Sequence, residues 1–426
     1  MFEGGCGIDA FAAVSLAGRH REAGTDPLAW AGELLDASLI TVTEGTDGEP
    51  RIRMLETLRD YAVERLEHDG DPDAVRRRHA EHYAAFAEQA CDQLRGRAQR
   101  AWLDRLETEH DYLRAALRWS LDASAVGPEA DDRAALGLRL VQNVAPFWYQ
   151  HGHAVEGRRW LERAIQVASG HPGAPLARVA HWLGVLLQQQ GDEAAAIPLF
   201  ERSLDIWREL GDENQQAVQL NSIGITRRSL GELDAARSYF EDSIAIARRI
   251  GSDIRLSTAL GNLGILEIDA GNADRAIEVL QEALVLDQKA GDTWGVAIIH
   301  NSLAAASLLA GRSEEAHRLL VSVLADITGS GDLELMAATL ELAAGIAAHL
   351  GDTKRAARLA GAAEAIRDKT GIPITESDAA WLERYLTPAR AAMEPDGWGK
   401  ELAAGRALSQ QEAVTLIARP FNTVPR

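Results

Sequence analysis

Apolar positions in the C-terminal half of the chain recur with the period of an α-helix. Between two glycines, Ala236, Phe240, Ile244 and Ala247 lie three or four residues apart, with mostly polar side chains between them. This spacing puts the apolar side chains on one side of a helix and predicts an amphipathic helix over each such stretch. The stretches are separated by glycines at a step of twenty residues, at positions 191, 211, 231, 251, 271, 291, 311, 331, 351 and 371. Glycines at such a regular spacing predict an array of structural repeats.

The repeating unit is forty residues long, because the sequences that follow alternate glycines differ. Units begin at Pro175, Gln215, Arg255, Gly295 and Leu335, and the twenty-second residue of each is an alanine, at positions 196, 236, 276, 316 and 356. A glycine just past a helix can take the left-handed conformation that ends it, and a following Asp or Glu can cap the next helix. Each unit is therefore predicted to be a hairpin of two helices that approach most closely at the alanine.

The unit that starts at Gln215 carries a recognisable set of positions. Ile223-Gly224, Ala236, Phe240 and Ser243 stand where tetratricopeptide repeats have Leu-Gly, Ala, Phe and Ala, so the unit resembles such a repeat in a lengthened form. The resemblance implies a mainly α fold, an α-solenoid of 40-residue helical hairpins. The first helices of such hairpins line an extended concave surface.

The first seventy residues have a different pattern. It predicts a helix, a strand, a turn and a returning strand over residues 27–40, 39–43, 44–50 and 51–55. Together with a following helix, these elements predict a small winged-helix-like domain with a β-hairpin over residues 1–70. The candidate recognition helix and its start carry Asp26, Glu33 and Asp36 and no Lys or Arg. These acids would repel DNA phosphates, so packing against protein is the favoured role.

Three further regions complete the expected organisation. Residues 71–134 read as connecting helices, with Asp71-Pro72 as a helix start and residues 123–132 as a loop. Residues 135–374 read as one degenerate repeat and five full units. Residues 375–426 read as capping helices and a tail, with Ser409 and Glu412 spaced as a capping box.

Composition narrows the classes of partner. The chain has 44 Lys and Arg against 64 Asp and Glu, a formal net charge of −20. Nucleic-acid binders usually display a basic surface, so we expect no direct binding of nucleic acid. No run approaches the roughly eighteen apolar residues that cross a bilayer. Cys6 and Cys91 lie far apart without a CxxC pair, which is typical of a reducing cytoplasm and predicts a cytoplasmic location.

Several motifs follow one another in a fixed order. They are MLETLRDYA at 54–62, RRHAEHY at 77–83, LETEHDYLRAAL at 106–117, FWYQHG at 147–152, EGRRWL at 156–161 and GRALS at 405–409. In this order they resemble landmarks of the large bacterial signal-transduction ATPases (STAND proteins) among the LuxR-type and antibiotic-regulatory transcriptional regulators. The resemblance implies that the winged helix holds an ATPase closed and that inducer binding to the repeats releases it.

The nucleotide-binding part of that family has no counterpart in the sequence. There is no GxxxxGK[ST] phosphate loop, and the four lysines stand late in the chain, at positions 289, 354, 369 and 400. We therefore expect the sensor half of a regulator, whether as a fragment, a late start or a short paralogue. No cofactor is expected.

Candidate binding residues follow from the inward positions of tetratricopeptide repeats. Carried over to this chain, the main ones are Arg178, His181, Trp182, Gln188, Asn221, Arg228, Asn262, Asp269, Asn301 and Glu341. Asn221, Asn262 and Asn301 recur at nearly the same place in successive units. A row of amides could hold the backbone of a peptide or protein partner. It could equally satisfy buried backbone groups between helices, and the sequence leaves both alternatives open.

Aromatic residues crowd the junction between the connecting helices and the first repeat: Trp102, Trp119, Phe147, Trp148 and Trp160. Most are expected in the core, although a pocket for a small apolar effector is a second possibility. His79 and His82, or His151 and His153, have no third and fourth ligand at useful spacing, so no metal site is expected. No serine elbow or paired nucleophile and base is present, which predicts no catalytic residues and no enzyme.

Two interpretations remain from the sequence. The first is a non-catalytic sensor or regulatory module that binds a peptide, protein or small effector in the groove of the repeats. The second is a stand-alone scaffold that tethers partner proteins without signalling. Neither interpretation indicates an oligomeric state.

Overall fold

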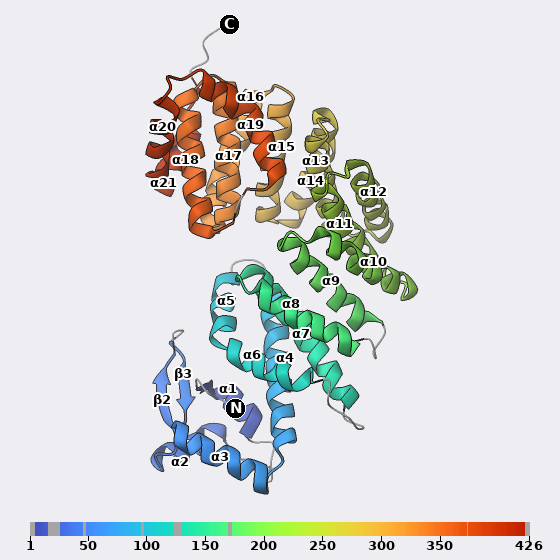
Figure 1. Ribbon diagram of the computed structural model, residues 1–426, viewed down its shortest axis with the longest axis vertical. Coiled ribbons are helices and arrows are strands. Elements are labelled where there is room, and N and C mark those ends of the chain that lie inside the picture. Colours follow the sequence, from blue (N-terminus) through green and yellow to red (C-terminus); the bar gives the residue numbers. More distant parts are fainter. Residues whose placement is uncertain are drawn as a thin grey trace. The chain divides into compact units, whose positions relative to one another are not determined.

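The computed structural model describes residues 5–15, 26–45, 48–94, 98–122, 130–168, 173–372 and 374–421. The chain divides into two compact units, Met1–Gly211 and Asp212–Arg426. Both are built mainly from helices, with strands only near the N-terminus in the described ranges (Figure 1). None of the helices found there is long and apolar enough to cross a membrane.

The described residues among the first seventy form a small sheet packed by helices. The elements are β1 (Cys6–Gly7), α1 (Ile8–Ser15), α2 (Pro27–Asp36), β2 (Thr41–Glu44), β3 (Pro50–Arg53) and α3 (Glu56–Asp69). The sheet has the antiparallel order β1-β3-β2, and the predicted β-hairpin is its β2–β3 part. The hydrophobic core of this region contains Phe11, Ala31, Ile40 and Ile52.

Two details of this region differ from the sequence prediction. Helix α2 ends at Asp36, four residues early, because Ser38 takes a left-handed conformation with φ 57° and turns the chain toward β2. Strand β1 was not predicted, since two residues carry too little pattern to identify a strand. It pairs Cys6 with Ile52 and so ties the N-terminus to the hairpin.

In the described part of the chain, five helices lie between this region and the five full repeat units. They are α4 (Pro72–Gln93), α5 (Gln99–Thr108), α6 (His110–Ser120), α7 (Ala130–Gln150) and α8 (Ala154–Ala168). The predicted helix start is confirmed, because the Asp71 side chain accepts a hydrogen bond from the backbone N–H of Ala74 and Pro72 takes the first helical position. Most of the predicted loop at 123–132 lies outside the described residues, and α7 begins at Ala130.

The predicted helical hairpins are confirmed. Their helices are α9 (Ala174–Gln189) and α10 (Glu193–Glu209) in the first unit of the chain, then α11 (Glu213–Ser229), α12 (Leu233–Ile250), α13 (Asp253–Asp269), α14 (Ala273–Ala290), α15 (Thr293–Leu309), α16 (Ser313–Ser330), α17 (Leu333–His349) and α18 (Thr353–Thr370) in the second. All ten glycines at the twenty-residue step have φ between 67° and 83°, the left-handed region that ends a helix.

Close packing inside each hairpin follows from small residues on both helices. The five repeated alanines of the second helices are completely buried. On the first helices, Gly224 and Gly264 face Phe240 and Leu280, and a Cβ atom at either glycine would come within 2.6 Å or 2.4 Å of that side chain. A larger residue on either side would force the two helices apart.

Three helices follow the last hairpin: α19 (Glu376–Ala391), α20 (Gly397–Arg406) and α21 (Gln410–Ala418). The capping box of Ser409 and Glu412 is present as predicted. Helix α20, which the sequence did not predict, packs on α18 through Gly361 and Gly405, where the backbones approach too closely for a Cβ atom. Helix α21 lies against α16, α17 and α18, so these two helices cover the end of the array.

Candidate functional site

Within the second unit, the first helices of successive hairpins lie side by side, α11 with α13, α13 with α15 and α15 with α17 (Figure 1). We call the surface that carries their predicted inward residues the first-helix face. The predicted residues on it are Asn221, Arg228, Asn262, Asp269, Asn301 and Glu341. The structure pairs most of these side chains across neighbouring helices.

Asn221 on α11 and Asn262 on α13 contact each other directly. The Nδ2 atom of Asn262 donates a hydrogen bond to Oδ1 of Asn221 over 3.0 Å. Both side chains are half-buried. An amide carries two donor hydrogens and an acceptor oxygen, so this bond leaves the oxygen of Asn262 and the amide nitrogen of Asn221 able to bind a further group.

About two helical turns further along the same two helices, Arg228 and Asp269 form an ion pair. The Nε atom of Arg228 donates to Oδ2 of Asp269 over 2.7 Å, and the side chains are 18% and 14% exposed. The hydroxyl of Ser377, at the start of α19, lies 3.4 Å from the other carboxylate oxygen of Asp269. The pair therefore lies on the first-helix face beside the N-terminal end of α19.

Asn301 and Glu341 are engaged more deeply in the array. Asn301 on α15 is 9% exposed and donates through Nδ2 to the hydroxyl of Thr339 on α17 over 2.9 Å. Glu341 accepts two hydrogen bonds of 3.0 Å from Arg367 on α18, and these bonds are the main reason that the pKa of Arg367 lies above its ordinary value. Both residues contribute more to the packing of the hairpins than to an open surface.

Helix α19 lies along part of the same face. Leu382 and Tyr385 approach Gly345 of α17, and the Tyr385 ring lies 6.0 Å from that of His349. Trp381 packs against the core around α15, and its indole N–H is buried without a hydrogen-bond partner among the described residues. The first-helix face of the last hairpins thus holds a helix of the same chain.

The other predicted groove residues belong to α9 in the first unit. Arg178 lies 3.4 Å from the oxygen of Gln142 on α7 and has its guanidinium 5.9 Å from the ring centre of Trp207. His181 contacts the rings of Trp182 and Phe200. Gln188 is half-buried near the end of α9.

The five candidate aromatic residues do not gather into one pocket. Phe147 and Trp148 are completely buried, and Trp102 is 9% exposed. Trp119 lies under the guanidinium of Arg133. Trp160 lines an open pocket of about 570 Å³, together with Gly152, His153, Val155, Glu156, Arg159 and Arg163.

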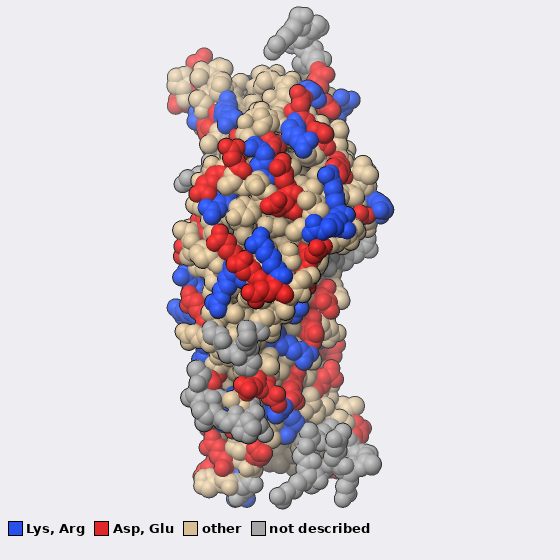
Figure 2. All heavy atoms as spheres, turned by 90° about the vertical axis from the view of Figure 1, so that its right-hand side faces the viewer, with Lys and Arg blue, Asp and Glu red and all other residues tan. Residues whose placement is uncertain are grey.

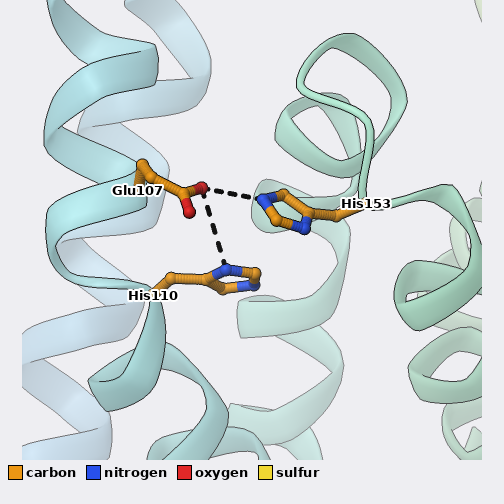
Figure 3. Close-up of side chains that lie close together, drawn as sticks. All are labelled: Glu107, His110 and His153. Atoms are coloured by element: carbon orange, nitrogen blue, oxygen red, sulfur yellow. Dashed lines mark hydrogen bonds and ion pairs between the residues drawn. The ribbon is translucent and has the colours of Figure 1, made fainter.

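Beside this pocket, the structure brings together side chains that the sequence did not connect. The carboxylate of Glu107 lies beside the imidazoles of His110 and His153, which approach it from α6 and from the turn before α8 (Figure 3). Its Oε2 atom is 2.7 Å from Nε2 of His153 and 4.0 Å from Nδ1 of His110. The residues are separated by up to 46 positions, so local spacing could not reveal them.

The charges in this cluster are set by burial and by neighbouring groups. Burial lowers the pKa of His110 to about 4. Burial raises the pKa of Glu156, but hydrogen bonds from Arg114 and Trp160 outweigh it and leave the pKa at about 2. The result is a neutral imidazole next to an ionised carboxylate at neutral pH.

Charged side chains elsewhere are interspersed by sign. On the face drawn in Figure 2, Lys and Arg lie among Asp and Glu and do not form a broad basic patch. Exposed ion pairs connect neighbouring hairpins, as between Arg248 and Glu282, and the two helices of one hairpin, as between Lys289 and Asp253.

Comparison with known proteins identifies the repeats. Residues 175–249 and 255–326 match the tetratricopeptide repeat family. The matched hairpins are tetratricopeptide repeats. The chain is also similar to proteins named HTH-type transcriptional regulators in Mycobacterium tuberculosis and Mycobacterium bovis, with 35% identity over 133 residues. That region makes up 31% of this chain but only 14% of each relative.

Solved structures of repeat proteins resemble the chain at low identity. One is a Rap protein complexed with competence and sporulation factor, with 15% identity and a TM-score of 0.48 over 79% of this chain and 88% of that one. Another is the apo form of the quorum sensor NprR from B. thuringiensis, with 11% identity and a TM-score of 0.46 over 85% and 93%.

Proposed function

We propose that the chain is a non-catalytic regulatory module that binds a peptide or protein segment on the first-helix face of its tetratricopeptide repeats. The observation that carries this proposal is the set of half-buried polar pairs, Asn221 with Asn262 and Arg228 with Asp269, at matching positions of α11 and α13. These pairs lie side by side on one face and offer both donors and acceptors.

The chemistry of the face suits a peptide backbone. Each peptide group presents one N–H and one C=O, and the amide pair has an oxygen and a nitrogen left to receive them. The ion pair beside it holds both charges in place before binding, which lowers the entropy cost of ordering them. The neighbouring α19 supports the proposal, because it places a helical segment of the chain on the adjoining part of the face.

The biological setting is proposed from the relatives. Proteins named HTH-type transcriptional regulators share 35% identity with part of this chain, and the ordered motifs from residue 54 to residue 161 resemble the STAND regulators. We infer that the module serves as the sensor part of such a regulator. The sheet and helices of residues 6–69 would then be its winged-helix-like part, which contacts protein rather than DNA.

Selection of peptides on the full chain tests the binding role. A phage-displayed library of random 12-residue peptides would be panned on the immobilised protein, and the Kd of each selected peptide would be measured by fluorescence anisotropy. We expect the double variant Asn262→Ala with Arg228→Ala to weaken binding at least tenfold.

The control is the double variant Arg275→Ala with Glu278→Ala, which removes an exposed ion pair from the second helix α14. It should leave the Kd unchanged. The proposal is wrong if the library yields no specific binder, or if the two double variants weaken the selected peptides equally.

A further inference from the structure

The cluster of Glu107, His110 and His153 has the composition of a metal site. Each residue offers one ligand atom, and the three atoms lie within 4.8 Å of one another. Two imidazoles and one carboxylate form a ligand set that binds Zn²⁺ in proteins, with a fourth position left to water. We propose that these three side chains bind a divalent transition metal ion of the Zn²⁺ type.

The distances fit such an ion after small side-chain movements. Tetrahedral bonds of about 2.0–2.1 Å place neighbouring ligand atoms about 3.3 Å apart. The observed separations from Oε2 of Glu107, 2.7 Å to His153 and 4.0 Å to His110, lie on either side of this value. A bound ion would replace the hydrogen bond between Glu107 and His153 and draw His110 inward (Figure 3).

The backbone places the ligands from rigid elements. Glu107 lies in the last turn of α5, and His110 is the first residue of α6. His153 precedes α8 and follows Gly152. The φ of Gly152 is 81°, a backbone conformation that residues other than glycine rarely adopt. The ion would therefore connect the α5–α6 corner to the α7–α8 turn.

A second carboxylate lies behind His110. The Nε2 atom of His110 is buried without a hydrogen bond in the described part of the chain, and it lies 3.7 Å from Oε1 of Glu156. Arg114 and Trp160 fix Glu156 by hydrogen bonds of 2.5–3.1 Å. Histidines that bind metal commonly donate their other N–H to such a carboxylate, which orients the ring. Glu156 is therefore a positioning residue for the site.

The ion also has a route to the site. Glu107 is 48% and His153 25% exposed, whereas His110 is 5% exposed. The open pocket lined by Gly152, His153, Glu156 and Trp160 adjoins the cluster. The fourth coordination position would face this pocket and hold a water molecule.

Titration of the tag-free, chelator-treated full chain with ZnCl₂ in a calorimeter tests the proposal. We expect one site per chain, and we expect His153→Ala to lower the Zn²⁺ affinity at least tenfold. Glu156→Gln should lower it about 10- to 100-fold. Two matched controls, His349→Ala and Glu162→Gln, should leave it unchanged.

Cobalt provides an independent signature, because the loaded wild-type chain should show the visible absorption bands of four-coordinate Co²⁺ and His153→Ala should lack them. His153 is partly exposed, so this variant is expected to fold, which its circular dichroism would verify. Absence of Zn²⁺ binding by the wild-type chain, or equal affinities of His153→Ala and His349→Ala, would overturn the proposal and leave the cluster as a hydrogen-bond network.

Discussion

Asn262 donates a hydrogen bond of 3.0 Å to Asn221, forty-one positions earlier in the chain. The repeat length brings these amides together, because one unit advances the chain by one hairpin and returns it to the same point on the next first helix. The bond joins α11 to α13 on the proposed binding face.

Loss of this bond should be measurable in the free protein. Asn262→Ala removes the donor from a half-buried pair, and we expect the free energy of unfolding to fall by about 1 kcal/mol. Urea unfolding followed by circular dichroism would measure it. Gln281→Ala, an exposed amide on α14, is the control and should change the value by less than about 0.5 kcal/mol. If the two variants change the free energy of unfolding equally, the bond between Asn221 and Asn262 adds nothing to stability.

The ion pair of Arg228 and Asp269 should contribute more than an exposed pair. Its side chains are 18% and 14% exposed, so water screens it weakly. A double-mutant cycle with alanine is expected to give a coupling energy of about 1–2 kcal/mol. The same cycle on Arg248 and Glu282, which are 55% and 43% exposed, should give less than about 1 kcal/mol. A larger coupling energy for Arg248 and Glu282 than for Arg228 and Asp269 would contradict this argument from burial.

The hairpins should reject larger residues at their closest contacts. Ala236 is completely buried between two helices, and Ala236→Leu should cost about 1–3 kcal/mol by overpacking. Ala245, on the same helix, is exposed, and Ala245→Leu should be nearly neutral. Thermal unfolding of the two variants distinguishes them. An unchanged melting temperature for Ala236→Leu would show that the predicted register is wrong.

A buried acid in α14 predicts a dependence on pH. Burial raises the pKa of Asp287 above its ordinary value of 3.8, although Ser257 donates a hydrogen bond to it. The unfolded carboxyl loses its proton more readily than the folded one, so this group costs stability as the pH rises above 3.8 and the full cost is present at neutral pH. Asp287→Asn removes the charge. It should raise the melting temperature at pH 7, and the gain should shrink as the pH falls toward 4.

A gain for Asp287→Asn that stays constant between pH 4 and pH 7 would contradict this explanation. Asp253→Asn is the control, because this exposed carboxylate binds Lys289 and its substitution removes a favourable pair. It should lower the melting temperature slightly or leave it unchanged.

The sequence predicted the repeats because their signals are local. A glycine at every twentieth position and an alanine within each second helix report on turns and contacts inside one hairpin, and both are found as expected. The capping residues Asp71 and Ser409 were predictable for the same reason, since a cap involves only the next three residues.

Contacts between distant segments could not be predicted in this way. The position of α19 on the first-helix face depends on where Leu382 and Tyr385 meet Gly345, about forty residues away, and the periodicity of α19 is compatible with many partners. The cluster of Glu107, His110 and His153 also depends on the approach of two separate corners. In the sequence, His151 and His153 have no third and fourth ligand at useful spacing, so no metal site was expected there.

The position of the bound peptide tests the central claim most directly. A peptide selected on the full chain would carry a photoreactive benzoylphenylalanine, and the crosslinked residues would be identified by mass spectrometry. We predict crosslinks in α11 and α13 around Asn221, Asn262 and Arg228, and at the start of α19 near Ser377. Crosslinks confined to the second helices α12 and α14 would contradict binding on the first-helix face.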